Sequence, residues 1–214
     1  GCTEPIAIAY AGAIARKYLG CLPERVEIEV SGNIIKNVKS VIVPNTGGLR
    51  GIEVAAAAGI VAGDADRELK VISEVSAAAV DAIHSFLKAV PISVDFSDSK
   101  KIFDIMITVY GGGHSAYVRI CEFHTNVVEI KEDDKYVLQR DVAVEDSLGF
   151  TDREFMNVQE ILEFADTVKI EDVKELLDQQ ISCNVNISEE GLRGDYGANI
   201  GKVLLKTYGD SDVK

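Results

Sequence analysis

The sequence has little of several residue types. Its 214 residues include no tryptophan, three histidines, four prolines and four cysteines. Phenylalanine and tyrosine supply seven residues each, so the core of the fold must be mainly aliphatic. The four cysteines, Cys2, Cys21, Cys121 and Cys183, are widely spaced and form no CxxC pair. This spacing excludes a disulfide framework, and these cysteines alone do not make a metal site.

The sequence also lacks an excess of positive charge, because 22 Lys and Arg residues face 35 Asp and Glu residues and give a net charge of −13. A protein that neutralises phosphates needs a basic stripe, so a nucleic-acid partner is excluded. There is no uncharged apolar run of about 18 residues, so no membrane span is expected. No secretion signal precedes the first motif, which favours a cytoplasmic protein. The chain has no initiator methionine, and we expect it to be a fragment of a longer one.

What is present is an ordinary globular composition, with 47% hydrophobic and 27% charged residues. The patterns predict an α+β fold with helices at both ends around a mainly antiparallel sheet. Residues 1–90 are expected to be a portion of helices and loops, residues 91–140 an antiparallel β meander, and residues 141–214 a helical portion. Together they are expected to form one compact fragment of a longer enzyme.

Local patterns assign the individual elements. Apolar spacing predicts helices over Glu4–Leu19, 51–63 and 65–89, the last with a break near Ser73. Short extended pieces are expected around Ile34–Ile35 and 41–43. The remaining predicted strands are 25–30, 92–96, 102–110, 116–123, 126–130 and 136–138, and the later predicted helices are 152–168, 171–180 and 196–208.

Cys2 stands immediately before the first predicted helix, which Thr3 precedes as a capping residue. Free backbone N–H groups and the positive end of the helix dipole lower the pKa of a nearby thiol. Cys2 is therefore a candidate reactive thiolate, although the negative charge of Glu4 opposes the effect. The alternative is a small residue near a frayed terminus.

Two polar loops follow at 31–37 and 44–48. Their amide, hydroxyl and backbone N–H groups suit a carboxylate, and one lysine adds a positive charge. Turn chemistry is the alternative, because Asn and Gly are ordinary turn residues. The candidate ligand-binding residues are Asn33, Lys36, Asn37, Asn45, Thr46 and Gly47.

His114 and His124 are candidate acids, bases or ligands, but a hairpin-turn histidine and a strand-end histidine are the preferred assignments. No second ligand stands at helical metal-binding spacing from either one. The sequence contains no P-loop, GxSxG or HExxH pattern, so those three enzyme classes are excluded.

Four segments together resemble the L-cysteine desulfidase family, which is related to the iron–sulfur L-serine dehydratase alpha chains. They are Gly1-Cys2-Thr3-Glu4-Pro5-Ile6-Ala7, the segment 31–37, the segment 43–51 and His124-Thr125-Asn126. They occur in the family's order. The resemblance implies β-elimination from a small amino acid with a 4Fe–4S cluster and without pyridoxal phosphate.

The resemblance also implies roles for particular residues. Cys2 would be the base that removes the α-proton of the substrate. The cluster ligands are expected in a C-terminal half of the protein, which would be the partner of this chain, so no metal ligand is assigned here. The expected substrate contacts are Thr3, Glu4, Asn33, Lys36, Asn37, Asn45, Thr46, Gly47 and His124.

Three interpretations stay open. The first is an L-cysteine lyase that produces pyruvate and ammonia, with L-serine as the alternative substrate. The second is an amino-acid-binding module in which the region 92–140 senses a ligand and Cys2 is incidental. The third is a scaffold for the other half of the protein.

Overall fold

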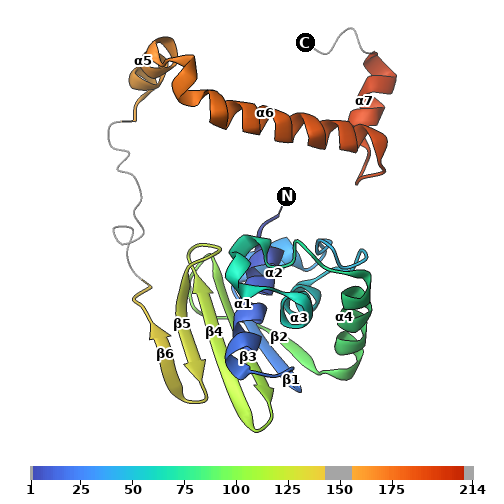
Figure 1. Cartoon of the computed structure of the whole chain (residues 1–214), viewed down its shortest axis with the longest axis vertical. Coiled ribbons are helices and arrows are strands. Elements are labelled where there is room, and N and C mark those ends of the chain that lie inside the picture. The colour runs from blue at the N-terminus through green and yellow to red at the C-terminus, as the bar shows by residue number, and fades with distance from the viewer. Residues whose placement is uncertain (1, 143–155, 210–214) are drawn as a thin grey trace. The chain divides into compact units, whose positions relative to one another are not determined.

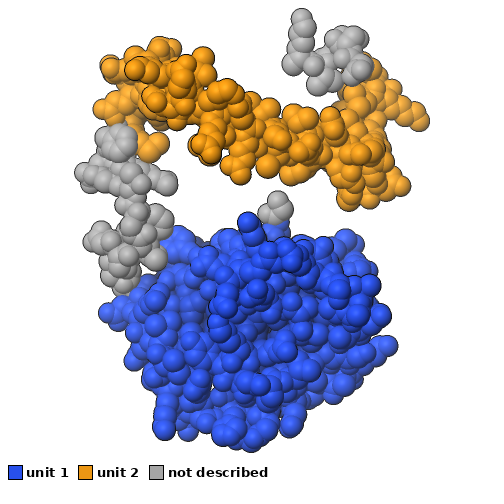
Figure 2. All heavy atoms as spheres, viewed as in Figure 1, with its two compact units in different colours: residues 1–148 blue, residues 149–214 orange. Residues whose placement is uncertain are grey.

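The computed structural model describes residues 2–142 and 156–209. The chain divides into two compact units, residues 1–148 and 149–214 (Figure 2). The expected α+β class is confirmed: helices stand at both ends of the chain order, around a six-stranded, mostly antiparallel sheet (Figure 1). The predicted portions 1–90 and 91–140 both lie in the first unit and contribute strands to the same sheet.

Most elements lie within a few residues of their predicted positions. The start of the predicted helix 152–168, up to residue 155, lies outside the described residues. The elements are α1 Glu4–Leu19, β1 Arg25–Val30, α2 Gly32–Val38, α3 Ile52–Ala62, the 3-10 helix η1 Ala65–Lys70, α4 Ala77–Ala89, β2 Ile92–Phe96, β3 Asp104–Gly111, β4 His114–Cys121, β5 Val127–Glu132, β6 Lys135–Gln139, α5 Val158–Thr167, α6 Ile170–Arg193 and α7 Ile200–Tyr208.

The strand order in the sheet is β2-β1-β3-β4-β5-β6. Strands β3 to β6 form the antiparallel meander that the sequence predicts. Strand β2 is the exception to that prediction, because it pairs in parallel with β1, with Ile28 opposite Val94. A parallel pair needs a long crossover, and α2, α3, η1 and α4 supply it.

One face of the sheet carries the core. Along the strands, alternate residues are fully buried, and α1 packs on them over β3 and β4. Helix α3 packs on α1, and α4 packs on α3. The fully buried sheet residues include Val26, Ile28, Val30, Ile105, Ile107, Val109, Ala116, Val118 and Ile120.

Helices α1 and α3 approach each other very closely. A Cβ atom built on Gly59 would lie 1.9 Å from the carbonyl oxygen of Ala9, and one built on Gly12 would lie 2.8 Å from that of Ala56. Both helices are rich in alanine and buried over most of their surface. A helix that is apolar all round must be covered on all sides, and only small side chains allow this separation.

Helix α2 corrects the predicted extended piece at Ile34–Ile35. Ser31 precedes it in an extended conformation, and the buried residues Ile34 and Val38 lie one turn apart on the inner face. Two adjacent isoleucines suit a strand as well as a helix, and contact with the core decides between them. The second extended piece, 41–43, contributes a single bridge, between Ile42 and Arg50.

The second unit consists of α5, α6 and α7. Helix α6 is longer than the predicted 171–180, and none of the three helices has a buried residue. Across the described ranges, no helix is both long enough and apolar enough to span a membrane.

The α1–α3 contact gives a stability prediction. Gly59→Ala should destabilise the first unit by about 3 kcal/mol, because the new methyl group would overlap a backbone carbonyl that cannot move independently. Gly191→Ala is the matched control, since nothing lies within 4 Å of the corresponding position in α6. Chemical denaturation followed by circular dichroism would measure both. Equal unfolding midpoints for the two variants would contradict the close contact.

Candidate functional site

The candidate site lies at the first turn of α1. Thr3 occupies the N-cap position, but its side chain makes no capping hydrogen bond. Its carbonyl oxygen accepts from the backbone N–H groups of Ile6 and Ala7, at 3.0 and 3.1 Å. Because the following turns of α1 are buried, this end of the helix is firmly placed, and Cys2 stands directly in front of it.

Cys2, Glu4 and Asn37 are in contact. The Cys2 thiol donates to Glu4 Oε2 at 2.9 Å, and the Asn37 side-chain amide donates to Glu4 Oε1 at 3.0 Å. The thiol also lies 3.8 Å from the carbonyl oxygen of Asn37. Helices α1 and α2 thus bring together residues 33 positions apart, and both oxygens of the Glu4 carboxylate are engaged.

The lowered thiol pKa predicted from the helix dipole is wrong. Burial raises the pKa of the Cys2 thiol, and the hydrogen bond to Glu4 and its negative charge raise it further. The pKa of Glu4 is lowered, because Cys2 and Asn37 both donate to its carboxylate. These shifts favour a protonated Cys2 thiol beside a negatively charged Glu4 carboxylate. The effect of Glu4 on the Cys2 pKa is therefore stronger than that of the helix dipole.

His124 approaches the same cluster from the sheet. It stands between β4 and β5, and its ring packs against Phe103 with 4.6 Å between ring centroids. An electrostatic interaction with His124 is a minor cause of the lowered pKa of Glu4, so the ring lies within electrostatic range of that carboxylate. The sequence gives no signal that Phe103 would pack against His124, because Phe103 is an ordinary apolar residue in front of a strand.

The loop 44–48 uses its polar groups for its own structure. The Asn45 amide donates to the carbonyl oxygens of Ile72 and Ser73, at 2.9 and 3.3 Å. The Thr46 hydroxyl is fully buried and donates to the carbonyl oxygen of Val43. Gly47 adopts a φ of 71°, which favours glycine. The Thr46 contact is that of a turn, the Asn45 contacts tie the loop to the segment after η1, and none of them brings the loop to Cys2.

Asn33 and Lys36 lie on α2, on the same short helix as Asn37. Asn33 is half-buried and Lys36 is exposed. Helix α2 therefore carries one lysine ammonium and two amides within five residues, and Asn37 contacts the Cys2–Glu4 pair.

The thiols of the described chain do not fit a 4Fe–4S cluster. Cys21 is exposed after α1, Cys121 is buried in β4, and Cys183 is exposed on α6 in the other unit. Burial raises the pKa of Cys121 to about 11, which disfavours the thiolate that a metal requires. Within residues 2–142 and 156–209, no group of three or more His, Cys, Asp or Glu residues could hold a metal ion.

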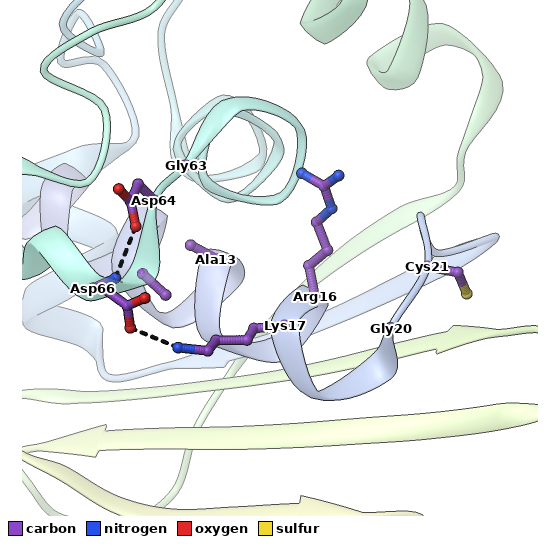
Figure 3. Close-up of a pocket in the computed structure, with 9 residues that line it drawn as sticks. Ala13, Arg16, Lys17, Gly20, Cys21, Gly63, Asp64 and Asp66 are labelled. Carbon is purple, nitrogen blue, oxygen red and sulfur yellow. Dashed lines mark hydrogen bonds and ion pairs between the residues drawn. The ribbon is translucent and has the colours of Figure 1, made fainter.

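A separate polar hollow of about 420 Å³ lies at the opposite end of α1 (Figure 3). Its cations are already engaged: Arg16 donates to the carbonyl oxygens of Ile60 and Val61, at 2.9 and 3.2 Å, and Lys17 pairs with Asp66 at 2.5 Å. Thirteen residues of helix separate Lys17 from Glu4, a rise of about 20 Å. The hollow is therefore distinct from the Cys2 cluster.

Comparisons with known proteins relate the whole chain to one group. It is 52% identical over 214 residues to a UPF0597 protein of Desulfitobacterium hafniense, a match that covers 100% of this chain and 50% of that protein. It is 41% identical over 207 residues to a UPF0597 protein of Treponema denticola, with coverage of 96% and 48%. The corresponding protein of Lachnoclostridium phytofermentans is 40% identical over 214 residues. No family model matches. The chain spans about half the length of the relatives it matches.

The Cys2–Glu4 contact gives a prediction about thiol reactivity. Glu4→Gln removes the negative charge that raises the pKa of the Cys2 thiol, so that pKa should fall. The measurement is the pH dependence of alkylation by iodoacetamide, in a Cys21→Ser/Cys183→Ser background that leaves Cys2 as the accessible thiol. The midpoint should move to lower pH in Glu4→Gln and stay unchanged in the control Glu24→Gln. An unchanged or higher midpoint in Glu4→Gln would contradict the contact.

Proposed function

We propose a β-elimination function for this chain, which belongs to the UPF0597 family over its whole length and spans about half the length of the relatives it matches. The substrate is L-cysteine, and the products are sulfide, pyruvate and ammonia. The resemblance of four segments to the L-cysteine desulfidases supports this reaction and implies a 4Fe–4S cluster in place of pyridoxal phosphate.

The observation that carries the proposal is the Cys2–Glu4–Asn37 cluster. A thiol stands before the first turn of a buried helix, and its proton points at a carboxylate 2.9 Å away. Three of the four segments behind the resemblance contribute to this cluster or lie within electrostatic range of it: the N-terminal segment, 31–37 and 124–126. Contacts between residues from separate segments are typical of a functional site. A residue in a frayed terminus would not require such contacts.

Cys2 must lose its own proton before it can accept one from the substrate. The acceptor already in contact is Glu4 Oε2, so the thiolate forms by transfer of the thiol proton to Glu4. The raised pKa of Cys2 and the lowered pKa of Glu4 make this transfer unfavourable in the resting state. The α-ammonium group of a bound amino acid brings a positive charge that offsets part of this cost.

The elimination then balances without an oxidant. The Cα–H bond breaks and its proton passes to Cys2 Sγ. The electron pair of the broken Cα–H bond forms the Cα–Cβ double bond. The sulfur of the substrate leaves with the electron pair of the Cβ–S bond. The released 2-aminoacrylate tautomerises and hydrolyses to pyruvate and ammonia.

The remaining expected contacts are assigned to the substrate carboxylate. Lys36 and Asn33 on α2 offer a cation and an amide beside the reactive pair, and His124 offers a ring nitrogen from the β4–β5 turn. Thr3 and the Asn45-Thr46-Gly47 loop are proposed as flanking contacts through backbone groups. Ligands for the implied cluster would have to come from residues other than the described thiols.

An amino-acid-binding module is the second candidate, and the protonated resting state of Cys2 favours it. In such a module Cys2 is incidental to binding, and its protonated thiol stays hydrogen-bonded to Glu4 without any chemistry. Calorimetry with L-cysteine and L-serine separates the two candidates. The module predicts undiminished binding in Cys2→Ala and no turnover in the wild type.

For the lyase, Cys2→Ser in the complete gene product, prepared without oxygen, should lower pyruvate release from L-cysteine by at least about 100-fold, since a serine hydroxyl is a far weaker proton acceptor at this position. Cys21→Ser is the matched control, because Cys21 is exposed at the other end of α1. Its activity should equal that of the wild type. Retained pyruvate release in Cys2→Ser would overturn the assignment of the base.

A further inference from the structure

The second unit exposes many large apolar side chains. None of its helices buries a residue, although Ile170, Leu176 and Ile187 of α6 are 72%, 70% and 71% exposed. Helices of ten and nine residues, as α5 and α7 are, are marginal in water without packing. Apolar surface of this kind marks an interaction site.

Six apolar residues of α6 form one stripe, which we call the α6 stripe. Its members recur at intervals of three, four or seven residues and therefore share one face of the helix. The opposite face carries Glu175, Gln179 and Asn186. The stripe consists of Ile170, Val173, Leu177, Ile181, Val185 and Leu192.

The shorter helices repeat this pattern. Val158, Ile161 and Leu162 of α5 are 74%, 51% and 60% exposed, and Ile200 and Val203 of α7 are 68% and 55% exposed. The α6 stripe alone extends along 24 residues, or about 36 Å of helix. This length suits a protein partner better than a small ligand.

The negative charge of α6 limits the kinds of partner that can bind to it. Helix α6 carries six acidic residues, Glu171, Asp172, Glu175, Asp178, Glu189 and Glu190, against the two cations Lys174 and Arg193. A second copy would bring the same negative charge to the interface, which disfavours self-association. Helices that lie on anionic lipid are rich in lysine and arginine, so a membrane surface is disfavoured as well.

The relatives contain a further segment that is large enough to cover the α6 stripe. This chain covers 50% of the Desulfitobacterium protein and 48% of the Treponema protein, so each contains about as much polypeptide again. Within one polypeptide such a segment meets the α6 stripe at high effective concentration.

We propose that the α6 stripe is the docking face for the half of the UPF0597 polypeptide that this chain does not match. The docking segment is helical, with an apolar face and basic residues at its margin. This inference does not depend on the chemistry of Cys2, and it stands if the lyase assignment fails.

Co-expression tests the proposal. The affinity-tagged chain is produced together with the half of the Desulfitobacterium protein that it does not match, and the complex is measured by size-exclusion chromatography with light scattering. A 1:1 complex is expected. Hydrogen exchange of the α6 amides should be fast in the chain alone and at least tenfold slower in the complex.

Paired variants localise the contact. Leu177→Glu/Ile181→Glu adds two negative charges to the α6 stripe and should weaken the complex at least 100-fold. Gln179→Glu/Asn186→Glu adds the same charge on the opposite face and should weaken it less than threefold. Circular dichroism checks that both variants keep their helix content.

Four results would overturn the proposal. The first is failure to recover a complex, and the second is equal weakening by the two paired variants. The third is a dimer of this chain alone that Leu177→Glu/Ile181→Glu dissociates, which would make a second copy the occupant. The fourth is slow exchange of α6 in the chain alone that the added half leaves unchanged, because the stripe would then be covered within this chain.

Discussion

The close packing of α1 against α3 is the constraint on which the first unit depends. The Ala9 carbonyl lies where a side chain of Gly59 would be, so the two helices touch through backbone atoms. This contact covers the side of α1 that the sheet leaves open, so most of this apolar helix is buried. A helix held on both sides keeps its first turn in place. The positions of Cys2 and Glu4 follow from that turn.

Much of this fold could be predicted from local signals. Helix α1 begins and ends at its predicted residues because Pro5 and Gly20 mark its two ends. The meander follows from alternating residues separated by turns. The parallel pairing of β2 with β1 could not be predicted, because it joins strands more than 60 residues apart and depends on how the intervening helices pack. Helix α2 was also missed, since the adjacent Ile34 and Ile35 fit either element.

The residues that make up the candidate site could be predicted from the sequence, but the direction of the pKa shift of Cys2 could not. The motifs singled out Cys2, Glu4 and Asn37, and the structure places these three residues in contact. The direction of the Cys2 pKa was wrong because a helix dipole contributes only about 0.3–1 kcal/mol at a surface site, while burial and a carboxylate in contact act more strongly and in the opposite direction. Asn45 could not be assigned from sequence, because the same amide serves a turn or a ligand equally well.

We propose that Cys2 accepts a proton from the α-carbon of an amino acid. Exchange of the α-proton of L-alanine is the most direct test, because L-alanine has no leaving group and proton removal can be measured without elimination. Proton NMR in D₂O, with the complete gene product, would follow the entry of deuterium at the α-carbon. The account predicts exchange in the wild type and at least a 100-fold slower rate in Cys2→Ser. Exchange at an equal rate in the two proteins would contradict it.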